Sequence, residues 1–397
     1  SSAASDVYKR QLLLIPFRKY FVSTMHGKYP FPEATATTQV LVSGEKGGNQ
    51  AKPLIIAGLI GGLYDFIVGT FGWWSETVST TVVGIGETLA EKAKLVMKVN
   101  TGAAVLGLGY IIGLKYSLII CAGSFLVWLI IIPLMSALFY DQVLTFGNDA
   151  ITATIGSMSP ELIFTTYARH IGIGGIATAG VIGIVKSWGI IKGAVGLAAK
   201  ELKGSSNVNT ESVQRTQKDI SMKIIAIGVI VTMVITLLFF QFGLLHNWFY
   251  AIIGLLLVGI IAFLFTTVAA NAIAIVGTNP VSGMTLMTLI LASIILVATG
   301  LSGTAGMVSA LIIGGVVCTA LSMAGGFITD LKIGYWLGST PVKQESWKFL
   351  GTLVSAATVG GVILILNQTY GFTSGQLAAP QANAMAAVIE PLMSGAG

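Results

Sequence analysis

The first side chain in this sequence that is suited to binding a proton or a cation is a carboxylate that follows two prolines. Glu33 comes after Pro30 and Pro32 and opens a small, threonine-rich segment. Proline loses no hydrogen bond at a helix start, and a carboxylate there meets the positive end of the helix dipole. At membrane depth the same carboxylate would bind a proton or a cationic group of a substrate. The residues leave both interpretations open, a helix cap and a proton or cation site.

A second candidate is the stretch GTNPVSGMT, residues 277–285, which interrupts a long apolar run. Pro280 lacks a backbone N–H and disfavours helix at Asn279. Non-helical backbone at membrane depth is tolerated only inside protein or along a wet cavity, and broken helices build substrate sites in secondary transporters. Asn271 upstream and Ser282 within the stretch add polar side chains. The alternative is a plain proline kink whose backbone groups are satisfied by serine and threonine.

Other polar residues lie in or beside apolar segments. Gln381 and Asn383 open the run LAAPQANAMAAV, residues 377–388, and offer donors and acceptors without charge; the alternative is that they cap a helix at the membrane interface. Asp65 lies inside an apolar segment. A charged side chain in the membrane is energetically unfavourable, so a carboxylate found there is expected to have a function. Asp330 and Lys332, in contrast, are expected to fix the structure of a loop.

The elements that must position these residues are membrane helices. Of 397 residues, 54% are hydrophobic and only 10% are charged, whereas soluble domains average about 25% charged residues. The 49 glycines suit close packing of helices in lipid. A net charge of +6 is ordinary for the loops of a membrane protein, so we expect no nucleic-acid partner. The sequence predicts an all-α, polytopic transmembrane bundle with discontinuous or re-entrant segments.

A membrane span needs about 20 mostly apolar residues. Residues 79–92 carry Glu87 and Glu91 and are expected to form a re-entrant or interfacial piece, and a half-length segment begins near residue 384. The predicted spans are 54–74, 102–114, 117–139, 171–190, 222–243, 247–268, 284–300, 304–326 and 350–367.

Basic residues orient the spans. The segments 191–221 and 330–348 are rich in lysine and arginine and are predicted to face the cytoplasm. Four spans separate them, so the two assignments agree. Counting back, Lys92 and Lys98 fall outside if 102–114 is a full span, which conflicts with the rule unless that span is re-entrant.

The two ends of the chain differ from the rest. Residues 1–11 are polar and resemble a cloning or assembly junction, so we expect them to be non-native. The last apolar stretch has only just begun when the sequence stops, so we expect the chain to be a fragment.

Six stretches of the sequence resemble the oligopeptide transporter (OPT) superfamily, which includes the yellow-stripe-like metal-chelate carriers. They occur in the order of that family, and together they cover the chain from about residue 17 to 397. Gln39 stands where the family has an acidic residue, which makes Glu33 the better candidate for a proton carrier. The stretches are YPFPEATATTQVLVSGE (29–45), GLGYIIG (107–113), YARHIGIGGIATAGVIGIVKS (167–187), GTNPVSGMT (277–285), DLKIGYWLGSTPVKQ (330–344) and APQANAMAAVIE (379–390).

The resemblance implies a proton-coupled symporter of small peptides or peptide-like compounds, with metal chelates as the alternative cargo. It also implies that the break at Asn279 and Pro280 lines a cavity. Members of that family are longer at the N-terminal side, so the resemblance implies that residues 12–397 are a transmembrane transporter domain, the C-terminal portion of a longer protein. The implied location is the inner (plasma) membrane of a prokaryote, as a multi-pass protein in the lipid bilayer. The residues assigned to the substrate and proton pathway are Glu33, Asp65, Asn271, Asn279, Pro280, Ser282, Gln381 and Asn383.

A membrane-embedded enzyme is the competing class. It would need a polar catalytic cluster at one interface, and the sequence carries no such constellation, no set of metal ligands at the usual spacing and no phosphate-binding loop. We therefore expect no catalytic residues, no cofactor and no resident metal. A passive channel stays open as a further alternative.

Overall fold

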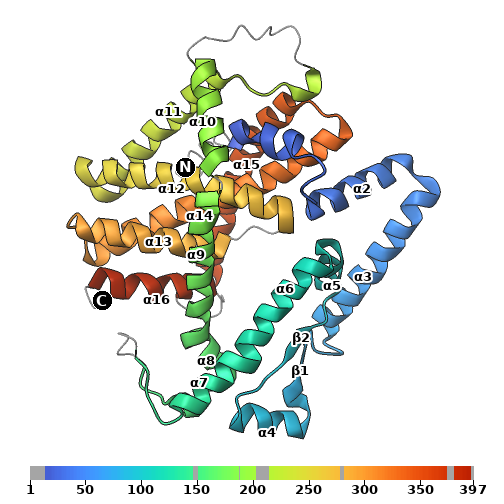
Figure 1. The fold of residues 1–397 in the computed structure, drawn as a ribbon, viewed down its shortest axis with the longest axis vertical. Coiled ribbons are helices and arrows are strands. Elements are labelled where there is room, and N and C mark those ends of the chain that lie inside the picture. The colour runs from blue at the N-terminus through green and yellow to red at the C-terminus, as the bar shows by residue number, and fades with distance from the viewer. Residues whose placement is uncertain are drawn as a thin grey trace. The chain divides into compact units, whose positions relative to one another are not determined.

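The computed structural model describes residues 14–145, 151–186, 188–202, 214–277, 281–372 and 380–394. The expected junction, residues 1–11, lies outside these ranges. The described chain is almost entirely helical (Figure 1), which confirms the all-α prediction. It forms two compact units, one of Thr35–Gly175 and the other of Ile176–Gly397 together with the residues up to Ala34.

Six helical segments among the described residues are long and apolar enough to cross a membrane. Their lengths, 24 to 35 residues, exceed the roughly 20 residues that a bilayer requires. The polytopic prediction is thereby confirmed. The six segments are Gly48–Phe71, Leu114–Phe139, Arg215–Leu245, Trp248–Val276, Gly303–Leu337 and Pro341–Thr369.

The larger unit is built from long helices. Helices α12, α13 and α14 pack against one another, and α16 packs against α13 and α14. The elements of this unit, with α9 beginning at the end of the smaller one, are the π-helical turn η1 (Lys19–Thr24), α9 (Arg169–Lys186), α10 (Trp188–Leu202), α11 (Met222–Phe239), η8 (Phe240–Leu245), α12 (Trp248–Val276), α13 (Val281–Ala298), α14 (Gly303–Leu337), α15 (Pro341–Thr369) and α16 (Pro380–Ser394).

Parts of the segments 191–221 and 330–348, which we expected to lie between spans, are helical. Helix α14 continues through 330–337 because no proline interrupts it before Gly338, which ends the helix in the left-handed conformation. Helix α15 then begins with Pro341, a residue suited to the first helical position. Helix α10 likewise occupies the first part of 191–221. Asp330 and Lys332 lie near the end of α14, and Lys343 and Lys348 lie near the start of α15. Here the charges mark helix ends, and we mistook them for signs of a loop.

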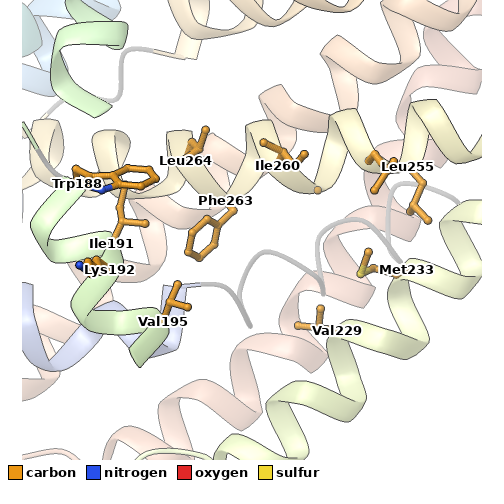
Figure 2. A pocket seen from close by; sticks show the side chains of 12 residues that line it. Trp188, Ile191, Lys192, Val195, Val229, Met233, Leu255, Ile260, Phe263 and Leu264 are labelled. Atoms are coloured by element: carbon orange, nitrogen blue, oxygen red, sulfur yellow. The ribbon is translucent and has the colours of Figure 1, made fainter. Parts of the chain in front are cut away.

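Helices α10, α11 and α12 enclose an apolar cavity of about 600 Å³ (Figure 2). Trp188 and Lys192 project from α10, Met233 from α11 and Phe263 from α12. Lys192 supplies the one charged group of the lining, so the wall presents hydrocarbon almost throughout.

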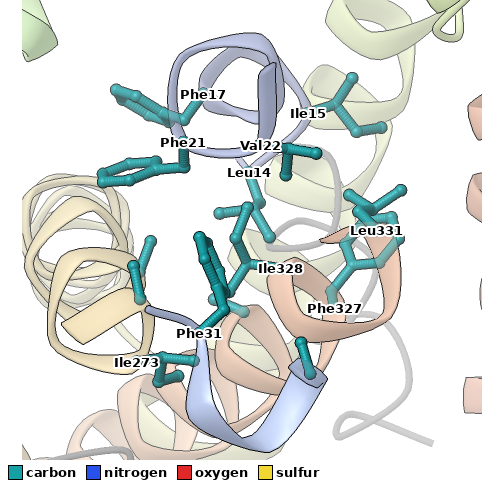
Figure 3. Packing of buried hydrophobic residues seen from close by; sticks show 14 of the residues in the cluster. Leu14, Ile15, Phe17, Phe21, Val22, Phe31, Ile273, Phe327, Ile328 and Leu331 are labelled. Atoms are coloured by element: carbon teal, nitrogen blue, oxygen red, sulfur yellow. The ribbon is translucent and has the colours of Figure 1, made fainter. Parts of the chain in front are cut away.

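The core of the larger unit forms around the first described residues of the chain (Figure 3). Phe17 and Phe21, from the helical segment that runs into and through η1, pack with Ile273 of α12 and with Phe327 and Ile328 of α14. All five side chains are buried, and each fully buried side chain of this size contributes about 1.5–3 kcal/mol. This cluster holds the segment that leads into Glu33 against α12 and α14.

The smaller unit contains shorter elements. Its core is formed by Ile132, Ile155, Ile163 and their neighbours. The elements are α2 (Pro32–Lys46, whose first turn belongs to the larger unit), η2 (Gly48–Gln50), α3 (Ala51–Phe71), β1 (Thr77–Ser79), η3 (Thr80–Val82), α4 (Gly84–Lys92), β2 (Lys98–Asn100), α5 (Ala103–Ile112), α6 (Leu114–Phe125), η4 (Leu126–Ile131), α7 (Ile132–Phe139), η5 (Ile155–Ser157), α8 (Pro160–Ile163) and η6 (Phe164–Ala168).

Two details of the smaller unit bear on the expected span count. The expected span 102–114 is the ten-residue helix α5, which ends at Gly113 with φ of 85°. The region around 79–92 is a two-stranded antiparallel hairpin, β1 with β2, that encloses α4. Lys98 of β2 pairs with Glu161 at 2.8 Å. Burial alone would raise the pKa of Glu161. The hydrogen bond and the charge of Lys98, together with hydrogen bonds from Ser159 and from the Glu161 backbone, outweigh burial, and the pKa falls below its usual value.

Candidate functional site

Two of the breaks predicted from the sequence meet in the structure. The backbone N–H of Phe31 donates a 2.9 Å hydrogen bond to the carbonyl oxygen of Ala274, in the last turn of α12. Three residues later Gly277 ends that helix with φ of 80°. A Cβ added to Gly277 would lie 2.7 Å from Cγ of Pro32. The start of α2 and the end of α12 are therefore in direct contact.

Local chain chemistry explains this junction. The last carbonyls of a helix lack intrahelical partners, and the N–H of Phe31 satisfies one of them. Phe31 itself has φ of 42°, a left-handed conformation that is uncommon for a residue with a large side chain. Helix α2 begins directly afterwards at Pro32, with Glu33 in its first turn. Here Glu33 occupies the position at which a carboxylate favours the helix dipole.

A buried lysine joins a third motif to the junction. Lys332 of α14 is only 1% exposed. Its ammonium group donates to the carbonyl oxygen of Val22 at 2.8 Å and lies 3.0 Å from Nδ1 of His26. It also lies 5.3 Å from the ring centroid of Phe31, a distance at which a cation is attracted to an aromatic face.

Two more rings complete the surroundings of this ammonium group. The centroids of Tyr335 and Trp336 lie 4.9 and 5.0 Å from Nζ of Lys332. They follow Lys332 by three and four residues, so they lie on the same face of α14. That spacing was visible in the sequence and would have predicted the cluster. Our expectation that Lys332 fixes local structure agrees with these contacts, although it does so from a helix and not from a loop.

The segment between η1 and α2 carries one perturbed group. Tyr29 stands between Phe21 and Phe31, with ring centroids 6.2 and 6.5 Å away. Burial raises the pKa of Tyr29, and the neighbouring Tyr20 adds to the rise. This phenol therefore stays protonated and neutral across the physiological range.

Of the predicted pathway residues, Glu33 and Asn271 have described side chains near the junction. Glu33 is exposed. Asn271 lies one turn before Ala274 on α12, and its amide oxygen is buried with no hydrogen-bond donor among the described residues. An unsatisfied buried acceptor is costly unless water or a ligand supplies a donor. Asn271 is thus the polar group of this region best suited to a ligand.

The remaining predicted residues are less closely defined. Asn279 and Pro280 lie outside the described residues, between the end of α12 and the start of α13. Ser282 lies in α13, and Gln381 and Asn383 lie in α16. Only their backbone is described, but α13 and α16 pack against each other.

Asp65 lies in the smaller unit and has a structural contact. It is exposed on α3, and its carboxylate accepts the backbone N–H of Ala103 at 2.9 Å. Ala103 is the first residue of α5, so this carboxylate satisfies an N–H that has no partner within the helix. The contact gives Asp65 a role in starting α5, whatever else it does.

Two large cavities among the described residues contain no predicted pathway residue in their lining. The first is the apolar cavity of Figure 2. The second, about 640 Å³ in the smaller unit, is lined by Lys98 and Asn100 of β2 and by residues of α5 and α6. A peptide needs partners for its charged termini and backbone groups, which the wall of the first cavity does not offer.

Comparison with known proteins places this geometry in context. A family model described as the OPT oligopeptide transporter protein matches residues 11–397. A Haemophilus influenzae protein with a provisional name as an oligopeptide transporter is 25% identical over 425 aligned positions. The alignment covers 96% of this chain and 62% of that protein, so the chain spans about three fifths of the length of this relative.

Proposed function

This chain belongs to the OPT oligopeptide transporter family, and we propose on that basis that the whole protein is a proton-coupled symporter of small peptides or peptide-like compounds. One observation carries the assignment of the site. The two broken segments singled out in the sequence meet at the hydrogen bond between Phe31 and Ala274, beside a carboxylate and an unsatisfied amide.

The junction suits a peptide because it brings two helix ends of opposite polarity together. The end of α12 carries the negative end of its helix dipole, which favours the ammonium terminus of a peptide. The start of α2 carries the positive end and favours a carboxylate. Discontinuous helices bind substrates and coupling ions in this manner in other secondary transporters. Asn271 would add a neutral hydrogen-bond partner for a peptide amide.

We propose Glu33 as a proton carrier of the transport cycle. It lies in the first turn of α2, one residue from the contact between Pro32 and Gly277. Exposure gives the carboxylate access to protons, and its position at the junction would let a change of charge act on a bound substrate. Asn279, Pro280, Ser282, Gln381 and Asn383 remain proposed members of the pathway, on the strength of the sequence.

The alternative cargo is a metal chelate of the peptide-like kind. A chelate would bring its own ligands for the metal, so it needs the same carboxylate and amide recognition as a peptide. A membrane-embedded enzyme is disfavoured because the family is one of transporters. We place the protein in the plasma membrane of a prokaryote, since the relative named above is bacterial.

The test is uptake by the full-length protein in proteoliposomes with an imposed pH gradient, offered a mixed pool of peptides and chelates. Accumulation of a peptide against its concentration gradient is expected, and it should collapse when the pH gradient is abolished. Equilibration without accumulation would indicate a channel and defeat the proposal. Glu33→Gln should abolish gradient-driven accumulation. The matched control is Glu45→Gln, an exposed carboxylate at the other end of α2, which should accumulate peptide normally.

A further inference from the structure

Three charged side chains meet in the larger unit, away from the junction of α2 and α12. Arg18 is 1% exposed and Glu345 is fully buried at 0%, whereas the side chain of Asp219 is 25% exposed. They come from the helical segment that runs into η1, from the segment before α11 and from the first turns of α15. Three separate parts of the chain therefore place charge at one buried point.

The guanidinium group of Arg18 forms an ion pair with the carboxyl group of Asp219. Nη2 of Arg18 donates to Oδ2 of Asp219 at 2.8 Å, and Nε pairs with Oδ1 of the same carboxylate. A second bond from Nη2 reaches the carbonyl oxygen of Gln217 at 3.4 Å. A hydrogen bond between a guanidinium group and a carboxylate is about twice as strong as one between neutral groups. It fixes the position of the Asp219 carboxyl group.

Glu345 is satisfied on only one side. Its Oε2 accepts the backbone N–H of Ile220 at 2.9 Å. Its Oε1 is buried and has no donor among the described residues. The bond to Ile220 brings the Glu345 side chain beside the preceding residue, Asp219. If both carboxyl groups were ionised, two hydrogen-bond acceptors would face each other with no hydrogen to share.

The charges of the cluster do not balance. Arginine stays protonated in proteins, so an ionised Asp219 and an ionised Glu345 would leave one net negative charge in a buried place. Carboxylates that share a site cannot both ionise readily, and burial disfavours the charged form further. One bound proton removes the excess charge and supplies the hydrogen that the two carboxyl groups need.

In the part of the chain that the structure describes, the nearby lysines are not placed to neutralise the pair. Lys343 on the same helix is exposed, and Lys348 pairs with Asp330. Lys332 of α14 is bound to Val22 and His26. From the segment before α11, Lys218 is exposed and contributes its carbonyl oxygen to the N–H of Val342.

We propose that Arg18, Asp219 and Glu345 form a proton-binding site. Glu345 takes up one proton and becomes a neutral carboxylic acid, which donates its O–H to the carboxylate of Asp219. Arg18 is a positioning residue that holds the carboxyl group of Asp219 in place as the acceptor. The partly exposed side chain of Asp219 provides the route by which the proton enters and leaves, since Glu345 itself has no contact with solvent.

The site also lies where two segments are fastened together. Arg215 donates to Oγ1 of Thr340 at 2.8 Å and to the carbonyl oxygen of Gly338 at 3.1 Å. These bonds attach the segment before α11 to the start of α15. Loss of the proton would put a buried negative charge beside this attachment. Provided that the proposed symport holds, we assign this site to the proton coupling of the cycle, in addition to Glu33.

Infrared spectroscopy of the full-length protein in lipid vesicles tests the site without any transport measurement. At neutral pH we expect a C=O stretching band of a protonated carboxylic acid, which should disappear as the pH is raised. The band should be absent from Glu345→Gln. It should also be absent from Asp219→Asn, because Glu345 then ionises opposite Arg18. The second variant keeps the test decisive if the first fails to fold.

Asp330→Asn is the matched control, because Asp330 is a carboxylate paired with Lys348 at the accessible end of α14, and it should keep the band. A band that persists in both Glu345→Gln and Asp219→Asn, or no band in the unaltered protein, would overturn the site.

Uptake in the same vesicles tests the coupling separately. Glu345→Gln should lose accumulation driven by the pH gradient. Normal accumulation in a variant that lacks the band would remove the site from coupling. If the unaltered protein fails to accumulate substrate, the proposed symport fails, while the infrared result still decides the proton site.

Discussion

The backbone N–H of Phe31 and the carbonyl oxygen of Ala274 are joined by a hydrogen bond of 2.9 Å. Each residue belongs to a break in the chain that the sequence marks independently. One break begins with prolines and a carboxylate, and the other ends a membrane-length helix in a glycine. Their contact turns two separate irregularities into one local structure, which is why changes at either side should affect the other.

Gly277→Ala should weaken this contact in two ways. A residue with a Cβ in the left-handed conformation costs about 1–2 kcal/mol, and the added Cβ would lie 2.7 Å from Pro32. Gly338→Ala is the matched control, because Gly338 also ends a helix, with φ of 73°, and has nothing within 4 Å of an added Cβ. Thermal unfolding should show the larger loss for Gly277→Ala. Equal losses would mean that the contact with Pro32 adds nothing.

The same variant can be followed through the reactivity of a lysine. Phe31 covers the ammonium group of Lys332, so amine reagents should modify exposed Lys343 and spare Lys332 in the folded protein. In Gly277→Ala the modification of Lys332, measured by mass spectrometry, should rise while that of Lys343 stays constant. Unchanged protection of Lys332 would show that the start of α2 remains docked.

Cysteine labelling tests the orientation of the bundle. The structure brings 214–220 and 338–345 into contact, because the N–H of Val342 donates to the carbonyl oxygen of Lys218 at 3.0 Å. Both segments therefore lie on one side, which the basic residues predict to be the cytoplasm. Gln214→Cys and Ser346→Cys, both at exposed positions, should resist an impermeant reagent on intact cells and react after the membrane is opened.

The labelling needs a background in which Cys121 and Cys318 are replaced by serine, since neither is in a disulfide and Cys121 is exposed. Reaction of both sites in intact cells would reverse the orientation. Reaction of only one would contradict the contact between the two segments.

The proline of the second break can be tested by comparing stability with transport. An interior proline costs a regular helix about 3 kcal/mol, so Pro280→Ala should stabilise a plain kink. In a break that lines a substrate path, Pro280→Ala should leave folding intact and impair uptake. Asn279→Ala should impair uptake as well. Raised thermal stability with normal uptake in Pro280→Ala, together with normal uptake in Asn279→Ala, would remove the break from the pathway.

Two variants of Asp65 can distinguish a structural role of this residue from a role in transport. Asp65→Ala removes the acceptor for the N–H of Ala103 and should cost about 0.5–2 kcal/mol, the usual price of losing such a cap. Asp65→Asn keeps an acceptor and should unfold close to the temperature of the unaltered protein. If Asp65→Asn nevertheless loses uptake, the carboxylate has a role in the pathway; normal uptake confines Asp65 to starting α5.

The sequence predicted the helices well because long apolar runs carry a strong signal. The expected spans 222–243, 247–268 and 304–326 all lie within helices, but α12 and α14 extend further, to Val276 and Leu337. Helix α14 would be about 52 Å long at 1.5 Å per residue, well beyond the roughly 30 Å core of a bilayer. Hydropathy cannot locate such an end, because a helix continues into water until a residue such as Gly338 stops it.

Contacts between distant residues were beyond the reach of the sequence. Glu33 and Asn271 were chosen one at a time, and nothing in a single sequence indicates that Phe31 pairs with Ala274. Arg18, Asp219 and Glu345 were overlooked for the same reason, because each appears in the sequence as an ordinary charge near the end of a span. Only the folded chain shows that Glu345 is buried.

The bond between Lys332 and the carbonyl oxygen of Val22 closes a gap of 310 residues. At about 5–20 residues per second, a ribosome needs roughly 15–60 s to make the chain between these two partners. For that time the apolar segment around Phe17 and Phe21 has left the ribosome without the helices that later bury it. Insertion machinery or a chaperone must therefore shield this segment during synthesis, and the docking of α2 is among the last events in the maturation of the protein.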